Sequence, residues 1–169
     1  MRVNPFTAQS SRLYLPEKVK EQAKDRWVRQ QQVKAHQSID DAPFPRMIDF
    51  WFASIVMAAH RELPIPLEPS GAHFVTVGPN KQDVQRFPDF WEQTLTLLAV
   101  KTRGYDDPDC VKPTEVLKLA NRFADVGSVA LLSALEESAD MASARLYVLA
   151  DLFTEMATAT LERFQGVAF

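Results

Sequence analysis

Residues 44–63, FPRMIDFWFASIVMAAHREL, are nearly all apolar in their interior and decide the fold class of this chain. No residue from position 50 to position 59 is charged, and the aromatic and aliphatic side chains leave no wide polar stripe. A helix that is apolar on most sides is buried on most sides. The uncharged run is about half of the ~20 residues that a membrane span needs. The stretch therefore predicts the central helix of a soluble helical protein, stopped by Pro64.

Prolines and glycines divide the rest of the chain into further expected helices. Pro16 suits the first position of a helix over residues 16–35. The buried face of this helix is marked by apolar residues at every fourth position, namely Leu15, Val19, Ala23 and Trp27. Thr114 is the expected cap of a later helix and Gly127 its break from the next one. These later helices are expected over residues 88–103, 115–125, 128–138 and 139–164. The prediction is an all-α fold, a compact helical domain with five or six helices.

One short strand is expected over residues 73–77, HFVTV, followed by a turn at residues 78–80. Because one short strand cannot form a sheet alone, it pairs either with residues 12–15 or with a second copy of the chain across a dimer. The 169 residues suffice for one domain with its own core. We therefore expect a single helical domain over residues 1–169, with at most one short strand or hairpin.

Charge is distributed unevenly along the chain. The net charge is −3, whereas residues 1–36 hold eight basic and three acidic residues, which leaves +5 on this segment. Lys and Arg side chains that project together bind phosphates in a salt-sensitive way, so a nucleic-acid contact is one interpretation of the basic segment. The other interpretation is a solvated helix with ion pairs such as Asp25 with Arg29, each worth a few tenths of a kcal/mol.

The other reactive side chains match no catalytic or metal-binding motif. The single cysteine, Cys110, excludes an internal disulfide and favours a reducing, cytoplasmic setting. No two of the three histidines have the spacing of metal ligands, and His60 suits the C-terminal end of its helix. Asp106, Asp107 and Asp109 resemble the start of a calcium loop but lack its glycine and closing Glu, so helix capping is the preferred interpretation.

The order of elements over residues 12–66 resembles a known family. A short RLYL segment precedes a Lys/Glu-rich helix (EKVKEQAKDRW), a loop, and an aromatic helix (DFWFASIVMAAHREL) that stops at prolines. This order resembles the small DndE proteins of bacterial DNA phosphorothioation systems, and it is similar to the SspB component of the related single-stranded modification system. The resemblance implies a helical, oligomeric, DNA-binding protein that is linked to strand nicking, within a modification system paired with defence against phage.

The chain departs from the DndE pattern in two places. Its loop is acidic, with Asp40 and Asp41, and a helical extension follows at about residue 78. Residues 1–66 are therefore expected to form a basic arm and a DndE-like helix pair, and residues 67–169 a helical extension. The longer chain fits the SspB alternative better.

The resemblance and the basic segment together imply a set of site residues. Strand scission requires a nucleophile or an activated water beside the bound backbone, and location makes Tyr14 and His36 the candidate catalytic residues. Mg²⁺ or Mn²⁺ is the candidate cofactor of such a DNA-nicking endonuclease, and no residue is assigned as a metal ligand. The expected DNA phosphate contacts are Arg12, Lys18, Lys20, Lys24 and Arg29.

The alternative function is a non-catalytic helical dimerisation or adaptor protein. On that interpretation the aromatic helix and the C-terminal helix form a protein-binding surface, and the basic helix is only solvated. A homodimer or higher oligomer is expected for both functions, without membrane association. The first function adds DNA and other components of the modification system as partners. Salt-dependent DNA binding separates the two functions.

Overall fold

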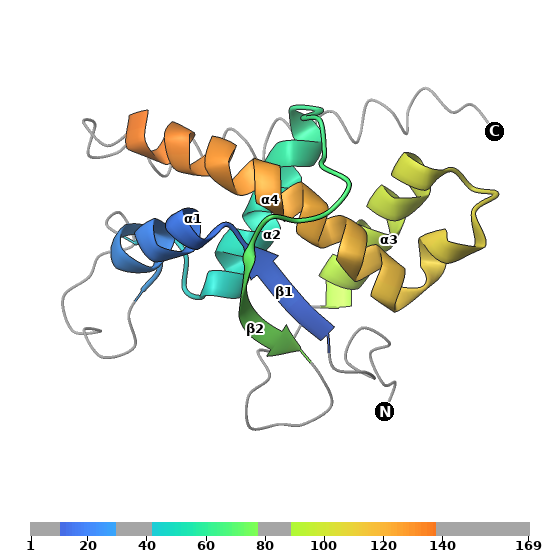
Figure 1. Cartoon of the computed structure of the whole chain (residues 1–169), viewed down its shortest axis with the longest axis horizontal. Coiled ribbons are helices and arrows are strands. Elements are labelled where there is room, and N and C mark those ends of the chain that lie inside the picture. The colour runs from blue at the N-terminus through green and yellow to red at the C-terminus, as the bar shows by residue number, and fades with distance from the viewer. Residues whose placement is uncertain (1–10, 30–41, 78–88, 138–169) are drawn as a thin grey trace.

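The computed structural model describes residues 11–29, 42–77 and 89–137, and these residues are mostly helical (Figure 1). They form four α-helices and one small antiparallel sheet of two strands. The elements in chain order are β1 (Ser11–Leu15), α1 (Glu17–Gln22), the π-helical turn η1 (Ala23–Trp27), α2 (Met47–His60), β2 (Ala72–Val77), α3 (Asp89–Arg103), the 3-10 turn η2 (Pro108–Val111) and α4 (Pro113–Glu137). The broadly all-α prediction is confirmed, but the expected count of five or six helices is wrong for the described residues.

The apolar stretch forms the centre of the fold, as predicted. Ten of the 14 residues of α2 are buried, on all sides of the helix. The first turn of α2 is held by Arg46, whose guanidinium donates to both carboxylate oxygens of Asp49 at 2.9 and 2.6 Å. This hydrogen bonding raises the pKa of Arg46 above its ordinary value. Within the described ranges, no helix is both long and apolar enough to cross a membrane.

The predicted break at Gly127 is wrong, because α4 runs without interruption from residue 113 to residue 137. Helix α4 crosses α2 and makes its most extensive contact with it (Figure 1). A Cβ atom at position 127 would lie 2.7 Å from the carbonyl carbon of Ser54 and 2.9 Å from the Cβ of Ala58. The two helix backbones approach so closely at this point that a residue without a side chain is needed. The packing of α4 on α2 offsets the cost of glycine in a helix, which is about 1 kcal/mol relative to alanine.

Two further helix boundaries differ from the prediction. Thr114 lies inside the first turn of α4 and is not its cap, since the helix begins at Pro113. The first helical segment ends at Trp27, and Val28 is extended and pairs with Phe44. The remainder of the predicted helix over residues 16–35, from residue 30 onward, lies outside the described residues, as does the predicted helix over residues 139–164.

The buried face of the first helical segment is confirmed. Val19, Ala23 and Trp27 of this segment are at most 6% exposed, and so is Leu15, which ends β1 just before the helix begins. A spacing of four residues is longer than the 3.6 residues of an α-helical turn, so an ideal helix would rotate these side chains away from one line. The wider π-helical turn over Ala23–Trp27 keeps the last two members on the same face.

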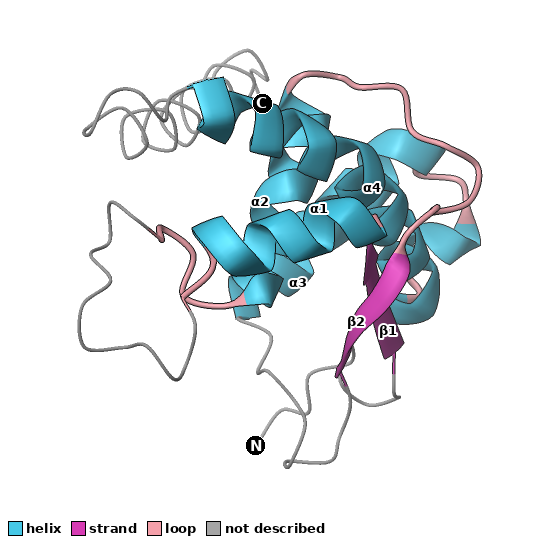
Figure 2. Cartoon of the chain, turned by 60° about the vertical axis from the view of Figure 1, so that its left-hand side comes forward, coloured by secondary structure: helices cyan, strands magenta, loops and turns pink. Residues whose placement is uncertain are grey.

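The predicted strand pairs within the chain. Strands β1 and β2 are antiparallel, with Arg12 opposite Thr76 and Tyr14 opposite His73. The sheet lies at one edge of the helices (Figure 2), and β1 packs against α4. The chain enters β2 through Gly71, where a Cβ atom would lie 2.5 Å from the carbonyl oxygen of Leu15. Of the two expected pairings, the structure has the one with residues 12–15.

Candidate functional site

The predicted phosphate contacts do not form one uniform cationic surface. Arg12 on β1 and Lys18 and Lys24 on the first helical segment are exposed. Lys20 is partly buried and pairs with Glu17 on the same helix. The Nε of Arg29 donates to the carbonyl of Ala42 at 3.2 Å. Three of the five predicted cations are therefore open to a ligand, and two are bound to the protein itself.

Acidic side chains share the surface of this segment. Over residues 17–27 there are four basic and three acidic side chains, so the described helix carries only +1. Arg26 also pairs with Glu136 of α4 at 3.8 Å. The expected ion pair of Asp25 with Arg29 is not among the ion pairs of the described residues, because the helix ends before residue 29 and the two residues no longer share a helical face.

The two candidate catalytic residues are not brought together by the described structure. His36 lies outside the described residues. Tyr14 is half-buried on β1, and the edge of its ring faces His73, with the ring centroids 6.3 Å apart. The backbone amide of Tyr14 donates to Oδ1 of Asn121 at 3.0 Å. Tyr14 thus contacts its strand partner His73 through its ring and the buried side-chain amide of Asn121 through its backbone.

Buried polar groups on α4 fasten the fold around this point. Asn121 is 4% exposed. Its Oδ1 also accepts from the indole nitrogen of Trp51 at 3.2 Å, and its Nδ2 donates to the carbonyl of Arg12 at 3.0 Å. One amide therefore connects α4 to β1 and to α2. Its three hydrogen bonds are all internal, so Asn121 has a structural role.

A second buried polar residue holds the segment that connects α2 to β2. We call this segment, residues 61–71, the strap. Asp125 of α4 accepts from the hydroxyl of Ser70 at 2.8 Å and from its backbone amide at 3.3 Å. Ser128 donates to the carbonyl of Asp125 at 3.0 Å. Arg122 binds the strap from the same helix, because its Nε donates to the carbonyl of Pro66.

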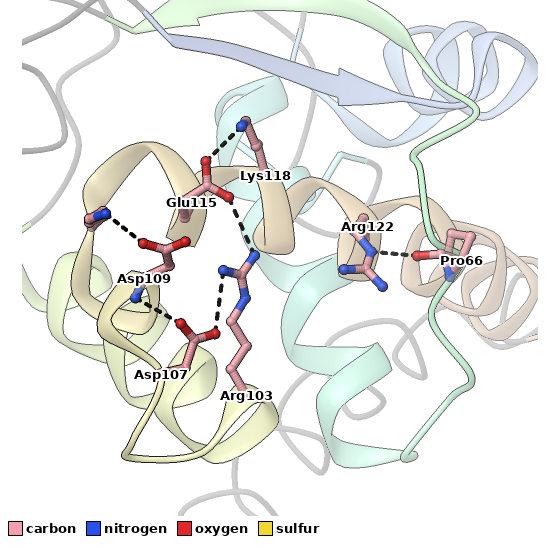
Figure 3. Close-up of polar contacts among 8 residues, drawn as sticks. Pro66, Arg103, Asp107, Asp109, Glu115, Lys118 and Arg122 are labelled. Atoms are coloured by element: carbon pink, nitrogen blue, oxygen red, sulfur yellow. Dashed lines mark hydrogen bonds and ion pairs between the residues drawn. The ribbon is translucent and has the colours of Figure 1, made fainter.

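The strap, β1, α3 and α4 line an open hollow of about 620 Å³. Figure 3 shows charged residues of α3 and α4 at this place, with Arg122 facing Pro66. Glu115 lies between two cations, since it is 2.6 Å from Lys118 and 3.6 Å from Arg103. The lining residues are Tyr14, Leu67, Glu68, Pro69, Gly71, Arg103, Glu115, Lys118, Asn121 and Arg122. The hollow thus combines three cations with two carboxylates.

The acidic turn serves as a helix cap, as predicted. The side chain of Asp107 accepts from the amide of Asp109 at 2.9 Å. Asp109 pairs with Lys112 at 2.6 Å, and this hydrogen bond lowers the pKa of the Asp109 carboxyl below its ordinary value. Cys110 is buried, in agreement with a packing role. Within the described ranges, no three His, Cys, Asp or Glu side chains are grouped so as to hold a metal ion.

No family model matches this chain, and no curated protein or solved structure matches it either. The site must therefore be judged from its residues. The sequence interpretation missed the hollow, although one signal was visible. Lys118 and Arg122 are like charges four residues apart on the same expected helix, a spacing that places them side by side.

Proposed function

We propose that this chain binds DNA through the phosphate backbone, as a component of a bacterial phosphorothioation and phage-defence system of the DndE/SspB type. The observation that carries the proposal is the exposure of three cations on successive elements, Arg12 on β1, Lys18 on α1 and Lys24 on η1. Each such cation that contacts a phosphate releases counterions and adds to a salt-dependent affinity. The resemblance over residues 12–66 supplies the class of system.

The finer part of the proposal is that the protein nicks DNA. Tyr14 supports it by position, since it lies two residues from Arg12 on β1. His36 is the second candidate residue, and Mg²⁺ or Mn²⁺ the candidate cofactor. Scission requires stabilisation of the charge that develops on the phosphate, and arginine and lysine side chains are suited to that task.

The test of DNA binding is a salt series with a fluorescent 20-base-pair duplex, followed by anisotropy. The variant with Arg12→Ala, Lys18→Ala and Lys24→Ala is compared with wild type. Each phosphate contact contributes about 0.9 to the slope of log affinity against log salt, so three lost contacts should lower the slope by roughly 2 to 3. The matched control replaces the exposed Lys101 and Lys112 by Ala and should keep the wild-type slope. An unchanged slope in the triple variant would refute the proposal.

Nicking is tested separately with supercoiled plasmid, with and without Mg²⁺ or Mn²⁺. Conversion to the nicked circle by wild type, and its loss in Tyr14→Phe or His36→Ala, would support a catalytic role for the altered residue. Absence of nicked product with every metal would remove the endonuclease part and leave DNA binding to be judged alone.

An adaptor function is the second candidate, and one observation favours it. Large apolar side chains are exposed around α3 and η2, where Leu97 is 64%, Tyr105 88% and Val111 60% exposed. Exposed apolar patches mark protein contacts. A protein that neither shifts DNA nor nicks plasmid, but whose sedimentation coefficient falls when Leu97 and Val111 are replaced by Ser, would be assigned to this class.

A further inference from the structure

The charged residues of the hollow differ from the buried polar residues beside them. Asn121 and Asp125 are used by backbone and side-chain partners within the fold. Lys118, by contrast, has a side chain that is 70% exposed. Arg122 forms no ion pair with any described carboxylate, and its Nε is held by the carbonyl of Pro66. The side chain of Lys118 and the terminal nitrogens of Arg122 therefore do not hold α4 to another element.

Lys118 and Arg122 lie one turn apart on α4. Like charges at this spacing repel each other and destabilise a helix slightly, so the pair has no benefit for the helix itself. The strap fixes the guanidinium of Arg122 through its Nε, and this leaves the two terminal nitrogens, Nη1 and Nη2, as parallel donors. A guanidinium that is already oriented loses little side-chain freedom when a planar or tetrahedral oxyanion binds to it.

Among the cations that line the hollow, Arg122 is the one that pairs with no described carboxylate. Arg103 and Lys118 are both paired with Glu115, and Arg103 also lies 3.9 Å from Asp107. Two carboxylates thus serve two of the three cations, and one positive charge remains on Arg122. Glu68 is the other carboxylate of the lining; it is exposed to solvent, which weakens its repulsion of an anion without removing it. An oxyanion bound to the terminal nitrogens of Arg122 would supply the negative partner that no described carboxylate provides.

We propose that the hollow binds a single phosphate group, with Arg122 as the bidentate donor and Lys118 as the second cation. The volume of about 620 Å³ exceeds what a phosphate ion needs and lies in the range of small-ligand sites. Tyr14 and Pro69 add apolar surface to the wall. The group that we assign to carry the phosphate is a nucleotide unit, either free or within a DNA strand, because its base can lie against this surface. This inference goes beyond the proposed DNA binding, because a free nucleotide satisfies the same donors.

The test measures binding of two probes by isothermal titration calorimetry, thymidine 5′-monophosphate and a twelve-residue oligothymidylate. Thymidine without phosphate is the ligand control. Arg122→Gln should weaken phosphate-dependent binding by roughly tenfold or more, since it removes charge-assisted hydrogen bonds. Lys118→Gln leaves the strap untouched and should weaken phosphate-dependent binding severalfold. Glu68→Gln should tighten binding by about two- to threefold, because it removes a nearby negative charge.

Lys112→Gln is the matched control for Lys118→Gln. Lys112 is also exposed and also pairs with a carboxylate three residues earlier at 2.6 Å, but it does not line the hollow. Thermal unfolding of each variant separates loss of the site from loss of the fold. Lys118→Gln is expected to weaken binding and Glu68→Gln to tighten it. These opposite changes in affinity are expected even if Arg122→Gln loosens the strap.

Each outcome decides the proposal. Binding of the mononucleotide that falls in Arg122→Gln and Lys118→Gln supports it with a free nucleotide as ligand, even if wild type binds no DNA and the proposed function fails. Binding of the oligothymidylate alone, with the same sensitivity, supports it with DNA as the source. If DNA binding depends on Arg12, Lys18 and Lys24 but is unchanged in Arg122→Gln and Lys118→Gln, this inference is overturned and the proposed function stays intact. Binding of neither probe also overturns it.

Discussion

Helix α4 has two faces that use polar residues in opposite ways. We call the face that meets α2, with Asn121 and Gly127, the packed face, and the face with Lys118 and Arg122 the hollow face. The side-chain amide of Asn121 is buried and paired within the fold. On the hollow face, Lys118 is exposed and pairs with Glu115, whereas Arg122 is partly buried and donates to a carbonyl of the strap. The packed face therefore specifies how α4 meets α2, whereas the hollow face leaves cationic donors unused by α2.

The largest expected effect is on the packed face at Gly127. Gly127→Ala places a methyl group against the backbone of Ser54, so α2 and α4 must move apart. We expect the free energy of unfolding in urea to fall by about 3 kcal/mol, the upper range for overpacking a core. At an open helical site the same change would stabilise the helix by up to about 1 kcal/mol. The sign alone therefore tests the close approach.

Ser133→Ala is the control for this variant, because Ser133 is exposed on the same helix. It should change the unfolding free energy by less than about 0.5 kcal/mol. A neutral or stabilising effect of Gly127→Ala would contradict the close packing of α4 on α2.

The second effect is the loss of the buried amide on the packed face. Asn121→Ala removes the acceptor used by the Tyr14 amide and the Trp51 indole, and the donor to the Arg12 carbonyl. We expect a loss of about 2 kcal/mol in urea unfolding, the cost of removing hydrogen-bond partners from buried groups. Amide exchange at Tyr14 should also become faster. Gln93→Ala removes an exposed amide from α3 and is the matched control; equal losses in the two variants would refute the buried role.

The sequence predicted the parts of the fold that depend on local pattern. Residues 44–63 gave the central helix because an all-round apolar helix requires burial, and the spacing from Leu15 to Trp27 gave a buried face that the structure confirms. Gly127 was misjudged because a helix-breaking glycine and a glycine at a close crossing look the same until the partner helix is known. The partner, Ser54, is 73 residues away in the chain.

The candidate site was harder to predict, because it depends on segments that meet only in the folded chain. Arg103 of α3, Pro66 of the strap and Arg122 of α4 are distant in sequence. The basic residues of the N-terminal segment were visible as a charge count. That count could not show that Lys20 and Arg29 bind within the protein, since those contacts depend on where the helix ends.

The smallest effect concerns the exposed ion pairs beside the hollow face, and it sharpens the comparison most directly. Lys112 lowers the pKa of the Asp109 carboxyl, and Asp109 in turn raises the pKa of Lys112. Lys112→Gln should therefore return the Asp109 pKa towards its ordinary value, as measured by the pH titration of its carboxyl carbon in NMR. Thermal unfolding at neutral pH should barely change, because exposed ion pairs contribute little.

The pH dependence of this pair has a definite sign. A lowered carboxyl pKa stabilises the fold above the unfolded pKa, and this contribution disappears as the pH falls through the folded pKa, which lies below 3.8. A raised lysine pKa stabilises the fold below the unfolded pKa of 10.5, and this contribution disappears as the pH rises through the folded value. Wild type and Lys112→Gln should thus converge at both extremes of pH. A loss as large as that of Asn121→Ala would show that exposed charges next to α4 also hold the fold together, and the distinction between its two faces would fail.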